Sequence, residues 1–400
     1  MTTRGRSVLA LGLVVYVAAW AFGSKPLYPV ASGLLLVSLV AWGWVHLSNG
    51  AFVVQRPATG GDHVEGDDVP IAVTVEPSTM VRPPVAELVE RIGRLGEHRH
   101  QLRPKGRRLA ITYTLASVPR GRYAFEDNRL ELSDPFGLQR VTVPLQAPGA
   151  LLVYPRIVHL DRLFSESGAH GLDGRRLLLR RPTGYDLHSV REYEHGESLR
   201  KVHWRSTAHR GHLMVKELED SPRDEIALVL DADAGAVIGG SFDTQVRAAA
   251  SIVDAYAARG RRTVLVINGA RREEQQLHAA ADGRRRALEL LAGAEPDGRT
   301  PLATLLADEG GAAARALELL VVTARLEPAA VDRLTQRALG HRKVALVYVD
   351  APSFAGAAPH PLPLLLRLQA AGVALAVVRA GDDLGTALEG SAAVAGVAHA

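Results

Sequence analysis

Cysteine is absent from the 400 residues of this chain, so disulfide bonds, thiolate metal sites and a cysteine nucleophile are excluded. The chain also lacks the Gly-rich loop followed by Lys and Ser or Thr that holds nucleotide phosphates, and it has no Gly-x-Gly-x-x-Gly motif after an expected strand. The motifs His-Glu-x-x-His and Gly-x-Ser-x-Gly are missing as well. These absences argue against nucleotide hydrolysis and against two common hydrolase mechanisms.

The composition is that of a folded chain, with 47% hydrophobic and 22% charged residues. At about 150 residues per domain, the length allows two or three domains. The net charge of +4 is unevenly distributed, because residues 175–216 contain ten basic residues and only four acidic ones. Such a local excess indicates one binding surface rather than a generally basic protein.

Two long uncharged runs lie at the beginning of the chain. There are 18 uncharged residues between Arg6 and Lys25 and 30 between Lys25 and Arg56. A bilayer core needs about 20 helical residues, so residues 1–50 are predicted to form a transmembrane hairpin. A signal peptide cleaved near Ala19-Trp-Ala is the alternative. Arg4 and Arg6 favour a cytoplasmic amino terminus, and a multi-pass protein of the cell membrane with the bulk of the chain in the cytoplasm is therefore expected.

Residues 51–160 are predicted to form a small β-sandwich. Short alternating or apolar runs are separated by turn signals rich in Gly, Pro and Asp; they cover residues 71–75, 109–115, 141–143 and 151–154. Several short strands at this spacing are typical of a sandwich.

From residue 225 to residue 400 the pattern changes to alternating strands and helices. Continuous apolar runs at residues 226–230, 263–267, 319–323, 344–349 and 373–378 are separated by helical stretches. This pattern predicts a parallel, doubly wound sheet, and so an α/β fold class for the chain. Ligands of such sheets bind at the carboxyl ends of strands, where Asp231 and Asp233 lie.

A longer motif lies between these regions, in residues 161–224. Within residues 181–217 the pattern Arg-x-Tyr-x-x-Gly-Glu-x-x-Arg-x-Val-x-Trp is followed by a basic stretch. It closely resembles the signature of the "domain of unknown function 58" family of bacterial membrane proteins. The residues that match are Arg191, Tyr193, Gly196, Glu197, Arg200, Trp204 and Arg205. Two further family motifs, Asp-Pro-Phe-Gly-Leu at residues 134–138 and Tyr-Pro-Arg at residues 154–156, occur in the right order.

The resemblance implies a carboxy-terminal domain similar to von Willebrand factor A domains. Those domains bind a metal through Asp-x-Ser-x-Ser, a distant Thr and a distant Asp. Here the corresponding candidates are Asp231, Asp233 and Thr300, two hydroxyl ligands are replaced, and Ala324 stands where the last Asp is expected. A divalent ion needs about six oxygens, so weak Mg²⁺ binding is the most that this set predicts, and no other cofactor is expected. The alternative is that both Asp residues cap the following loop.

The signature itself supplies a set of candidate partner-binding residues. Arg and aromatic side chains are typical of binding hot spots; the candidates are Arg191, Tyr193, Arg200, Trp204 and Arg205. The alternative is a structural role, in which Trp204 fills a core and the arginines pair with nearby glutamates.

Two functions remain open at this point. The first is a non-catalytic membrane adaptor or scaffold; the resemblance implies a MoxR-type AAA+ ATPase as its partner, in complex assembly or cell-envelope physiology, with no nucleic acid expected. The second is a protein that binds phosphate groups of nucleic acid or lipid, with weak metal-assisted hydrolysis at Asp231 and Asp233. The absence of a visible general base and of a full metal shell favours the first, a protein that is not an enzyme.

Overall fold

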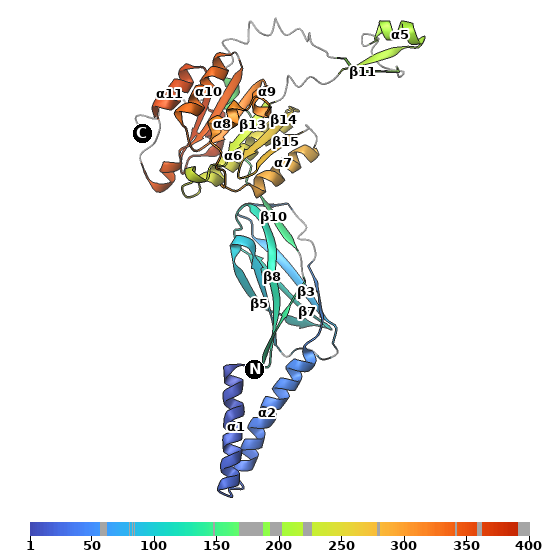
Figure 1. Ribbon diagram of the computed structural model, residues 1–400, viewed down its shortest axis with the longest axis vertical. Coiled ribbons are helices and arrows are strands. Elements are labelled where there is room, and N and C mark those ends of the chain that lie inside the picture. Colours follow the sequence, from blue (N-terminus) through green and yellow to red (C-terminus); the bar gives the residue numbers. More distant parts are fainter. Residues whose placement is uncertain are drawn as a thin grey trace. The chain divides into compact units, whose positions relative to one another are not determined.

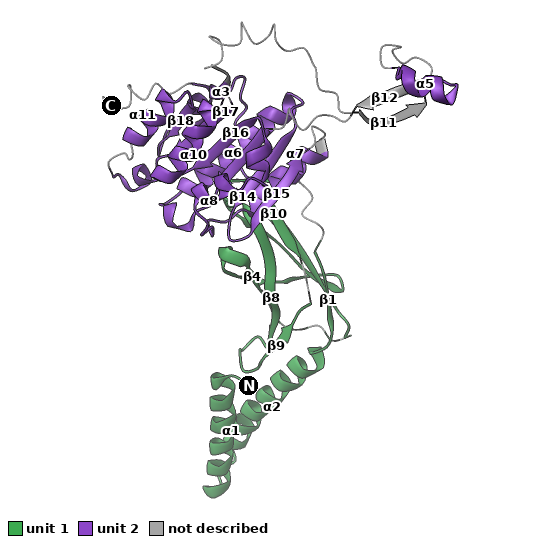
Figure 2. Ribbon diagram, turned by 45° about the horizontal axis from the view of Figure 1, so that its top comes forward, with its two compact units in different colours: residues 1–154 green, residues 155–400 purple. Residues whose placement is uncertain are grey.

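The chain is a mixed α/β protein that begins with two apolar helices. The computed structural model describes residues 1–56, 62–79, 81, 83, 85–146, 149–167, 187–192, 202–218, 226–277, 281–340, 342–357 and 362–390. The chain divides into two compact units, residues 1–154 and 155–400 (Figure 2). Each unit is described separately below.

The first unit opens with a helical hairpin, formed by α1 (Thr3–Ala21) and α2 (Leu27–Ser48) (Figure 1). The two helices meet through small residues: a Cβ atom on Gly12 would lie 3.1 Å from Leu34. Their large apolar side chains face outward instead, and Val14 is 63% exposed. Both helices are long and apolar enough to cross a membrane. Close packing through small residues with apolar side chains outside is the arrangement expected in lipid, because lipid rather than protein then covers the apolar surface.

The rest of the first unit consists of two sheets. Their strands are β1 (Phe52–Gln55), β2 (His63–Val64), β3 (Val69–Pro77), β4 (Val85–Ile92), β5 (Glu97–Gln101), β6 (Arg103–Lys105), β7 (Arg108–Leu115), β8 (Gly121–Ser133), β9 (Arg140–Pro144) and β10 (Ala150–Tyr154). One sheet has the order β1-β3-β7-β6, and the other has β2-β10-β8-β4-β5 with β9 paired to β8. Every pairing is antiparallel except that of β2 with β10.

One hydrophobic core lies between these two sheets. Alternate residues of β3, such as Ile71 and Val73, are fully buried together with Leu88 of β4 and Leu130 of β8. The period of two places every second side chain of β3 on this face.

A buried ion pair interrupts this apolar core. Glu90 of β4 is fully buried and forms an ion pair with Arg56. The Tyr113 hydroxyl donates a hydrogen bond of 2.7 Å to the second carboxylate oxygen of Glu90. The guanidinium of Arg56 also lies 3.8 Å from the ring centre of Phe125. The carboxylate thus has both a cation and a hydroxyl donor, which a buried charge requires.

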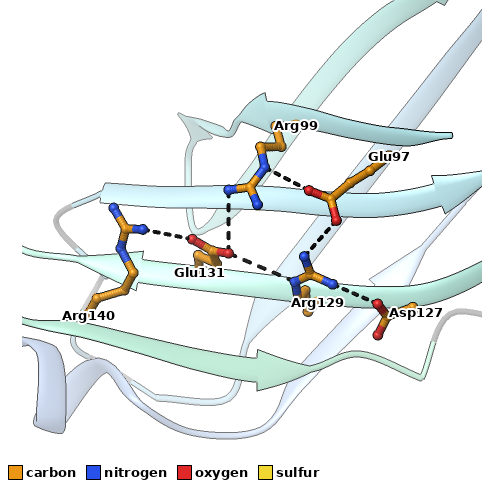
Figure 3. A network of polar contacts seen from close by, with 6 residues as sticks. All are labelled: Glu97, Arg99, Asp127, Arg129, Glu131 and Arg140. Carbon is orange, nitrogen blue, oxygen red and sulfur yellow. Dashed lines mark hydrogen bonds and ion pairs between the residues drawn. The ribbon is translucent and has the colours of Figure 1, made fainter.

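The outer face of the second sheet carries a network of three arginines and three acidic residues (Figure 3). Arg129 lies between Glu97, at 2.8 Å, and Asp127, at 2.7 Å. Arg99 and Arg140 reach Glu131 at 3.6 Å and 3.4 Å. Hydrogen bonds from Arg129 and Arg99 lower the pKa of the Glu97 carboxyl. The network joins β5, β8 and β9, and opposite charges on neighbouring strands stabilise a sheet modestly.

The second unit is built around a six-stranded sheet. Its strands are β13 (Ile226–Asp231), β14 (Thr263–Asn268), β15 (Arg272–Leu277), β16 (Glu318–Thr323), β17 (Lys343–Val349) and β18 (Ala374–Val378). Their order is β15-β14-β13-β16-β17-β18. All neighbours are parallel except β14 and β15. The order reverses at β13, so the strand that ends in Asp231 lies in the middle of the sheet.

Helices pack against this sheet and bury its apolar side chains. They are α3 (Phe164–Ser167), α6 (Ser241–Ala258), α7 (Ala281–Gly293), α8 (Leu302–Ala307), α9 (Ala312–Arg315), α10 (Pro328–Leu339), α11 (Leu362–Ala370) and α12 (Leu384–Glu389). Residues of α8, α9, α10 and α11 share one core with Ala227 and Val229 of β13. Helix α6 contacts β13, β14, β16 and β17 and contributes no residue to that core.

A separate small element of the second unit contains the family signature. It comprises β11 (Leu187–Glu192), α5 (Trp204–Arg210) and β12 (Met214–Leu218). The strands β11 and β12 pair with each other in a two-stranded antiparallel sheet.

The strands expected from the apolar runs are all present, with ends within two residues. The edge strand β15 was not predicted, because its sequence Arg-Glu-Glu-Gln-Gln-Leu is too polar to be recognised as a strand. It pairs with β14 in the antiparallel direction. The longest strand, β8, was missed as well. Its alternation is interrupted where the register with β4 shifts between Val89 and Arg91.

Candidate functional site

Three polar side chains meet at the carboxyl end of the central strands. Asp231 ends β13, Asn268 ends β14 and Thr323 ends β16. Because these three strands are parallel neighbours, their final residues lie side by side. We call Asp231, Asn268 and Thr323, with Asp233 and Arg325 from the following loops, the strand-end cluster.

Both oxygens of the buried Asp231 carboxylate accept hydrogen bonds within this cluster. Asn268 Nδ2 donates to Oδ1 at 2.9 Å, and Thr323 Oγ1 donates to Oδ2 at 2.8 Å. Asn268 also donates, at 2.9 Å, to the backbone oxygen of Thr300. Both donors to Asp231 are neutral groups.

The electrostatic consequence is a carboxyl group that holds its proton unusually well. Burial raises the pKa of Asp231 to about 6, against an ordinary value near 3.8, and the hydrogen bonds from Asn268 and Thr323 only partly offset this. The nearby charge of Asp233 raises the pKa further. Desolvation is the largest of these effects, since among the described residues no cation contacts the carboxylate directly.

Asp233 lies just beyond the strand end and has different partners. Its Oδ1 accepts from the backbone N–H of Gly235 at 2.9 Å, and its Oδ2 is 3.2 Å from Nη1 of Arg325. The backbone at Asp233 bridges to Gly298. A Cβ atom at Gly298 would lie 2.3 Å from the backbone oxygen of Asn268, so the close approach needs glycine here. The loop that carries Asp233 is therefore fixed in place by its own contacts.

The donor set does not fit a divalent cation. All four carboxylate oxygens of Asp231 and Asp233 already accept hydrogen bonds from protein groups, and one of those groups is the guanidinium of Arg325. Thr300 takes part through its backbone oxygen. A hard cation would have to compete with a fixed positive charge for too few oxygens.

Asn268, Thr323 and Arg325 were not recognised from the sequence as members of this cluster. The signal was available for the first two, since each is the polar residue that ends an apolar strand. Arg325 follows one residue after the position where a distant Asp was expected, and it places a positive charge next to Asp233.

The family signature forms a second candidate site. Helix α5 is capped by His203, whose Nδ1 accepts from the backbone N–H of Ser206 at 3.2 Å. Met214 is buried, and its carbonyl accepts from the backbone N–H of His203 at 2.7 Å. Thr207 Oγ1 accepts from the backbone N–H of Met214 at 3.0 Å. These contacts connect the start and the end of the segment 203–214 and fix α5 against the beginning of β12.

The tryptophan of the signature points outward from this fixed segment. Trp204 is 66% exposed. Arg205 is exposed next to it, and His209 and Arg210 are exposed in the last turn of the helix. No acidic residue lies between Val202 and Met214. The segment therefore presents a flat aromatic ring among positive charges.

The remaining signature candidates can be placed only in part. Arg191 lies in β11 and is paired in register with Val215 of β12. Tyr193 and Arg200 lie outside the described residues.

A model of one protein family matches this part of the chain. Residues 189–353 match the family described as "Protein of unknown function DUF58". This region is similar to the DUF58 family. The match includes the signature helix α5 and the strand-end cluster, and it confirms the resemblance that the motifs indicated.

A curated relative is similar to a larger part of the chain. It is the "Uncharacterized protein YeaD" of Bacillus subtilis (strain 168), 26% identical over 243 residues, which are 60% of this chain and 59% of the relative. The chain thus spans about three fifths of that relative's length.

Two solved structures show partial similarity. One is a von Willebrand factor type A protein from Catenulispora acidiphila, with a TM-score of 0.28, 13% identity, and coverage of 42% of this chain and 40% of that one. The other is an aerotolerance-related membrane protein from Bacteroides fragilis NCTC 9343, with a TM-score of 0.29, 12% identity, and coverage of 41% and 94%.

Proposed function

We propose that this DUF58 protein is a non-catalytic adaptor, anchored in a membrane by its helical hairpin, which binds a MoxR-type AAA+ ATPase through helix α5. Its parts are the hairpin, a β-sandwich formed by the two facing sheets of the first unit, and a doubly wound, von Willebrand factor A-like sheet in the second. Such an adaptor acts in complex assembly or cell-envelope physiology. The adaptor role requires neither a cofactor nor a nucleic acid.

The observation that carries the proposal is the exposure of Trp204 on a helix whose backbone is fixed. Exposing a tryptophan to water is unfavourable, and burying such a ring in a partner supplies much of the binding free energy at typical hot spots. The neighbouring Arg205 and Arg210 suit a partner with an acidic surface.

The strand-end cluster supports a role other than hydrolysis. Metal-assisted hydrolysis requires an ion that activates water and leaves open coordination positions. In this cluster the carboxylates are engaged by Asn268, Thr323 and Arg325. The phosphate-binding alternative retains only the charge of the signature segment in its favour.

The hairpin supports membrane anchoring with α1 retained. The side chain and backbone of Thr2 contact residues 137 and 138 of the first unit's sheets, and Tyr16 of α1 packs edge-on against Tyr28 of α2. Cleavage after Ala21 would remove these contacts.

The orientation in the membrane can be tested directly because the chain has no cysteine. With the amino terminus in the cytoplasm, a cysteine at Ser24 should react with an impermeant thiol reagent added outside intact cells, and one at Asp62 should react only after lysis. The reverse pattern would place residues 51–400 outside.

Partner binding is tested by pairing Trp204→Ala with Leu339→Ala, a change at a leucine of α10 that is equally exposed, at 66%. Trp204→Ala should leave the melting temperature unchanged and abolish recovery of the ATPase with the tagged full chain from detergent-solubilised membranes. A hot-spot truncation costs about 2 kcal/mol or more, roughly a 30-fold weaker complex. Leu339→Ala should change neither quantity.

Equal recovery of the ATPase with both variants would contradict the role of α5. A lowered melting temperature for Trp204→Ala alone would indicate a structural role for the ring. Loss of binding to anionic lipid or nucleic acid in place of an ATPase would favour the phosphate-binding alternative.

A further inference from the structure

The turn between β8 and β9, residues 134–138, has a shape set by its own hydrogen bonds. The backbone N–H of Gly137 donates to the Asp134 carbonyl at 3.0 Å, which closes a β-turn with Pro135 in its second position. The buried Asp134 carboxylate accepts from the backbone N–H groups of Phe136 at 2.9 Å and Gln139 at 2.5 Å. Gly137 has φ +68°, a conformation that favours glycine. The side chain of Phe136 is therefore presented in a fixed position.

The same turn contacts the beginning of helix α1. Thr2, the residue that caps this helix, donates from its hydroxyl to the Gly137 carbonyl at 2.7 Å and from its backbone N–H to the Leu138 carbonyl at 3.0 Å. Gly5 is buried at this contact, and a Cβ atom there would lie only 2.1 Å from the Leu138 oxygen. The start of α1 and the turn thus touch through backbone atoms.

This contact determines the depth of the turn relative to any bilayer that α1 crosses. Nineteen helical residues extend for about 28 Å, close to the roughly 30 Å thickness of a hydrocarbon core. Thr2 then lies at the boundary between the core and the headgroups. Arg4 and Arg6 in the first turn are exposed at the same end, where lipid phosphates lie.

The phenyl ring of Phe136 is apolar, yet the residue is 68% exposed on this turn. Its position beside the membrane end of α1 selects lipid as the medium that covers it, because aromatic rings partition favourably into the interface. Lipid is already required to cover the neighbouring side chains of α1 and α2.

We propose that the Asp-Pro-Phe-Gly-Leu turn is a membrane-surface contact, in which Phe136 inserts into the bilayer interface beside the first turn of α1. The inference rests on the proposed membrane insertion of the hairpin. It assigns a physical role to a motif that the adaptor function does not use, namely to hold the sheet that contains β8 and β9 at a fixed height above the lipid.

The test uses single cysteines in the full chain, reconstituted in phosphatidylethanolamine–phosphatidylglycerol nanodiscs, which leave both membrane faces accessible. An environment-sensitive fluorophore is attached at Phe136→Cys, at Leu36→Cys on the exposed side of α2, and at Ala124→Cys, an exposed position of β8. Ala124 lies about 30 Å from the turn end of that strand. Aqueous iodide and a lipid carrying a shallow nitroxide serve as quenchers.

The label at residue 136 should emit at shorter wavelength than the label at 124, should be quenched several-fold less by iodide, and should be quenched by the nitroxide lipid. The label at residue 36 should be protected from iodide more completely. A water-exposed label at 136 with a lipid-protected label at 36 overturns the inference while the hairpin stands. Water exposure of both labels overturns membrane insertion itself.

Protection from iodide at 136 without quenching by the nitroxide lipid would mean that protein covers the turn, and this also overturns the inference. Because the first label replaces the ring under study, Pro135→Cys serves as a second reporter with Phe136 intact. It should give the same result, and its melting temperature should lie only slightly below that of the wild type, because Pro135 is exposed and its ring contributes only by restricting the unfolded chain.

Discussion

Among the buried carboxylates of the two units, Glu90 in the first and Asp231 in the second are stabilised in different ways. In the first unit, Glu90 forms an ion pair with Arg56 and accepts a hydrogen bond from Tyr113. In the second, Asp231 is 4% exposed and accepts hydrogen bonds from the neutral groups of Asn268 and Thr323. The first carboxylate has a cation beside it, and in the part of the chain that the structure describes the second has none in direct contact.

This difference separates a structural ion pair from a protonation-sensitive position. Two opposite charges buried together depend on each other, since removing one leaves the other without compensation. An acid held by neutral donors in a dry site can accept a proton with little rearrangement, and the pKa of Asp231 is raised to about 6 for this reason. Three experiments test the contrast, beginning with the one that should have the largest effect.

Neutralising Glu90 should be strongly destabilising. Glu90→Gln leaves the guanidinium of Arg56 buried beside an uncharged amide, and breaking a buried pair typically costs about 3–5 kcal/mol. Thermal unfolding of the full chain in detergent should show a large decrease in the melting temperature of the first unit. Glu87→Gln, on the same strand but partly exposed, is the matched control and should change little. Equal melting temperatures for the two variants would mean that Arg56 does not depend on Glu90.

Neutralising Asp231 should have the opposite effect at neutral pH. The folded state binds this proton more tightly than the unfolded chain, so the contribution is fully present below about pH 4 and is lost as the pH rises through about 6. Asp231→Asn removes the charged form and should stabilise the protein at pH 7.5 by up to about 3 kcal/mol. It should also flatten the dependence of stability on pH between 4 and 6.

Asp233→Asn is the control for this experiment, because Asp233 is partly exposed and paired with Arg325. Its melting temperature should differ from that of the wild type by much less than that of Asp231→Asn. Destabilisation by Asp231→Asn at pH 7.5 would show that the ionised carboxylate is better solvated than its burial indicates.

Removing Arg325 should have the smallest effect on stability and a specific effect on metal binding. The pair of Arg325 with Asp233 is half exposed, so Arg325→Ala should cost under about 1 kcal/mol. Calorimetry with Mg²⁺ should show no binding tighter than about micromolar in the wild type, roughly −8 kcal/mol. Arg325→Ala should bind Mg²⁺ more tightly than the wild type, because the competing cation is gone. Tight Mg²⁺ binding by the wild type that is lost in Asp231→Ala would contradict the conclusion that the strand-end cluster does not fit a divalent cation.

Much of the architecture could be predicted from local patterns. The two uncharged runs gave the hairpin helices to within a few residues, and the apolar runs gave five of the strands of the large sheet. The edge strand β15 could not be found this way, because its side chains are mostly exposed and its pairing with β14 supplies what its composition does not indicate. The signature was recognised by its resemblance to a family pattern, and its residues are close together in sequence.

The sequence by itself determined which segments are apolar, where the strands end in polar residues and which family signature is present, because each of these depends on residues that are near one another along the chain. Only the tertiary structure decided how charges are compensated. A register shift in β4 turns Glu90 inward toward Arg56, and the parallel order of three strands brings Asn268 and Thr323 to Asp231. The packing of Gly5 against residue 138 places Phe136 at the end of α1. These contacts join residues between 34 and 135 positions apart, and burial removes the water that would otherwise compensate such groups.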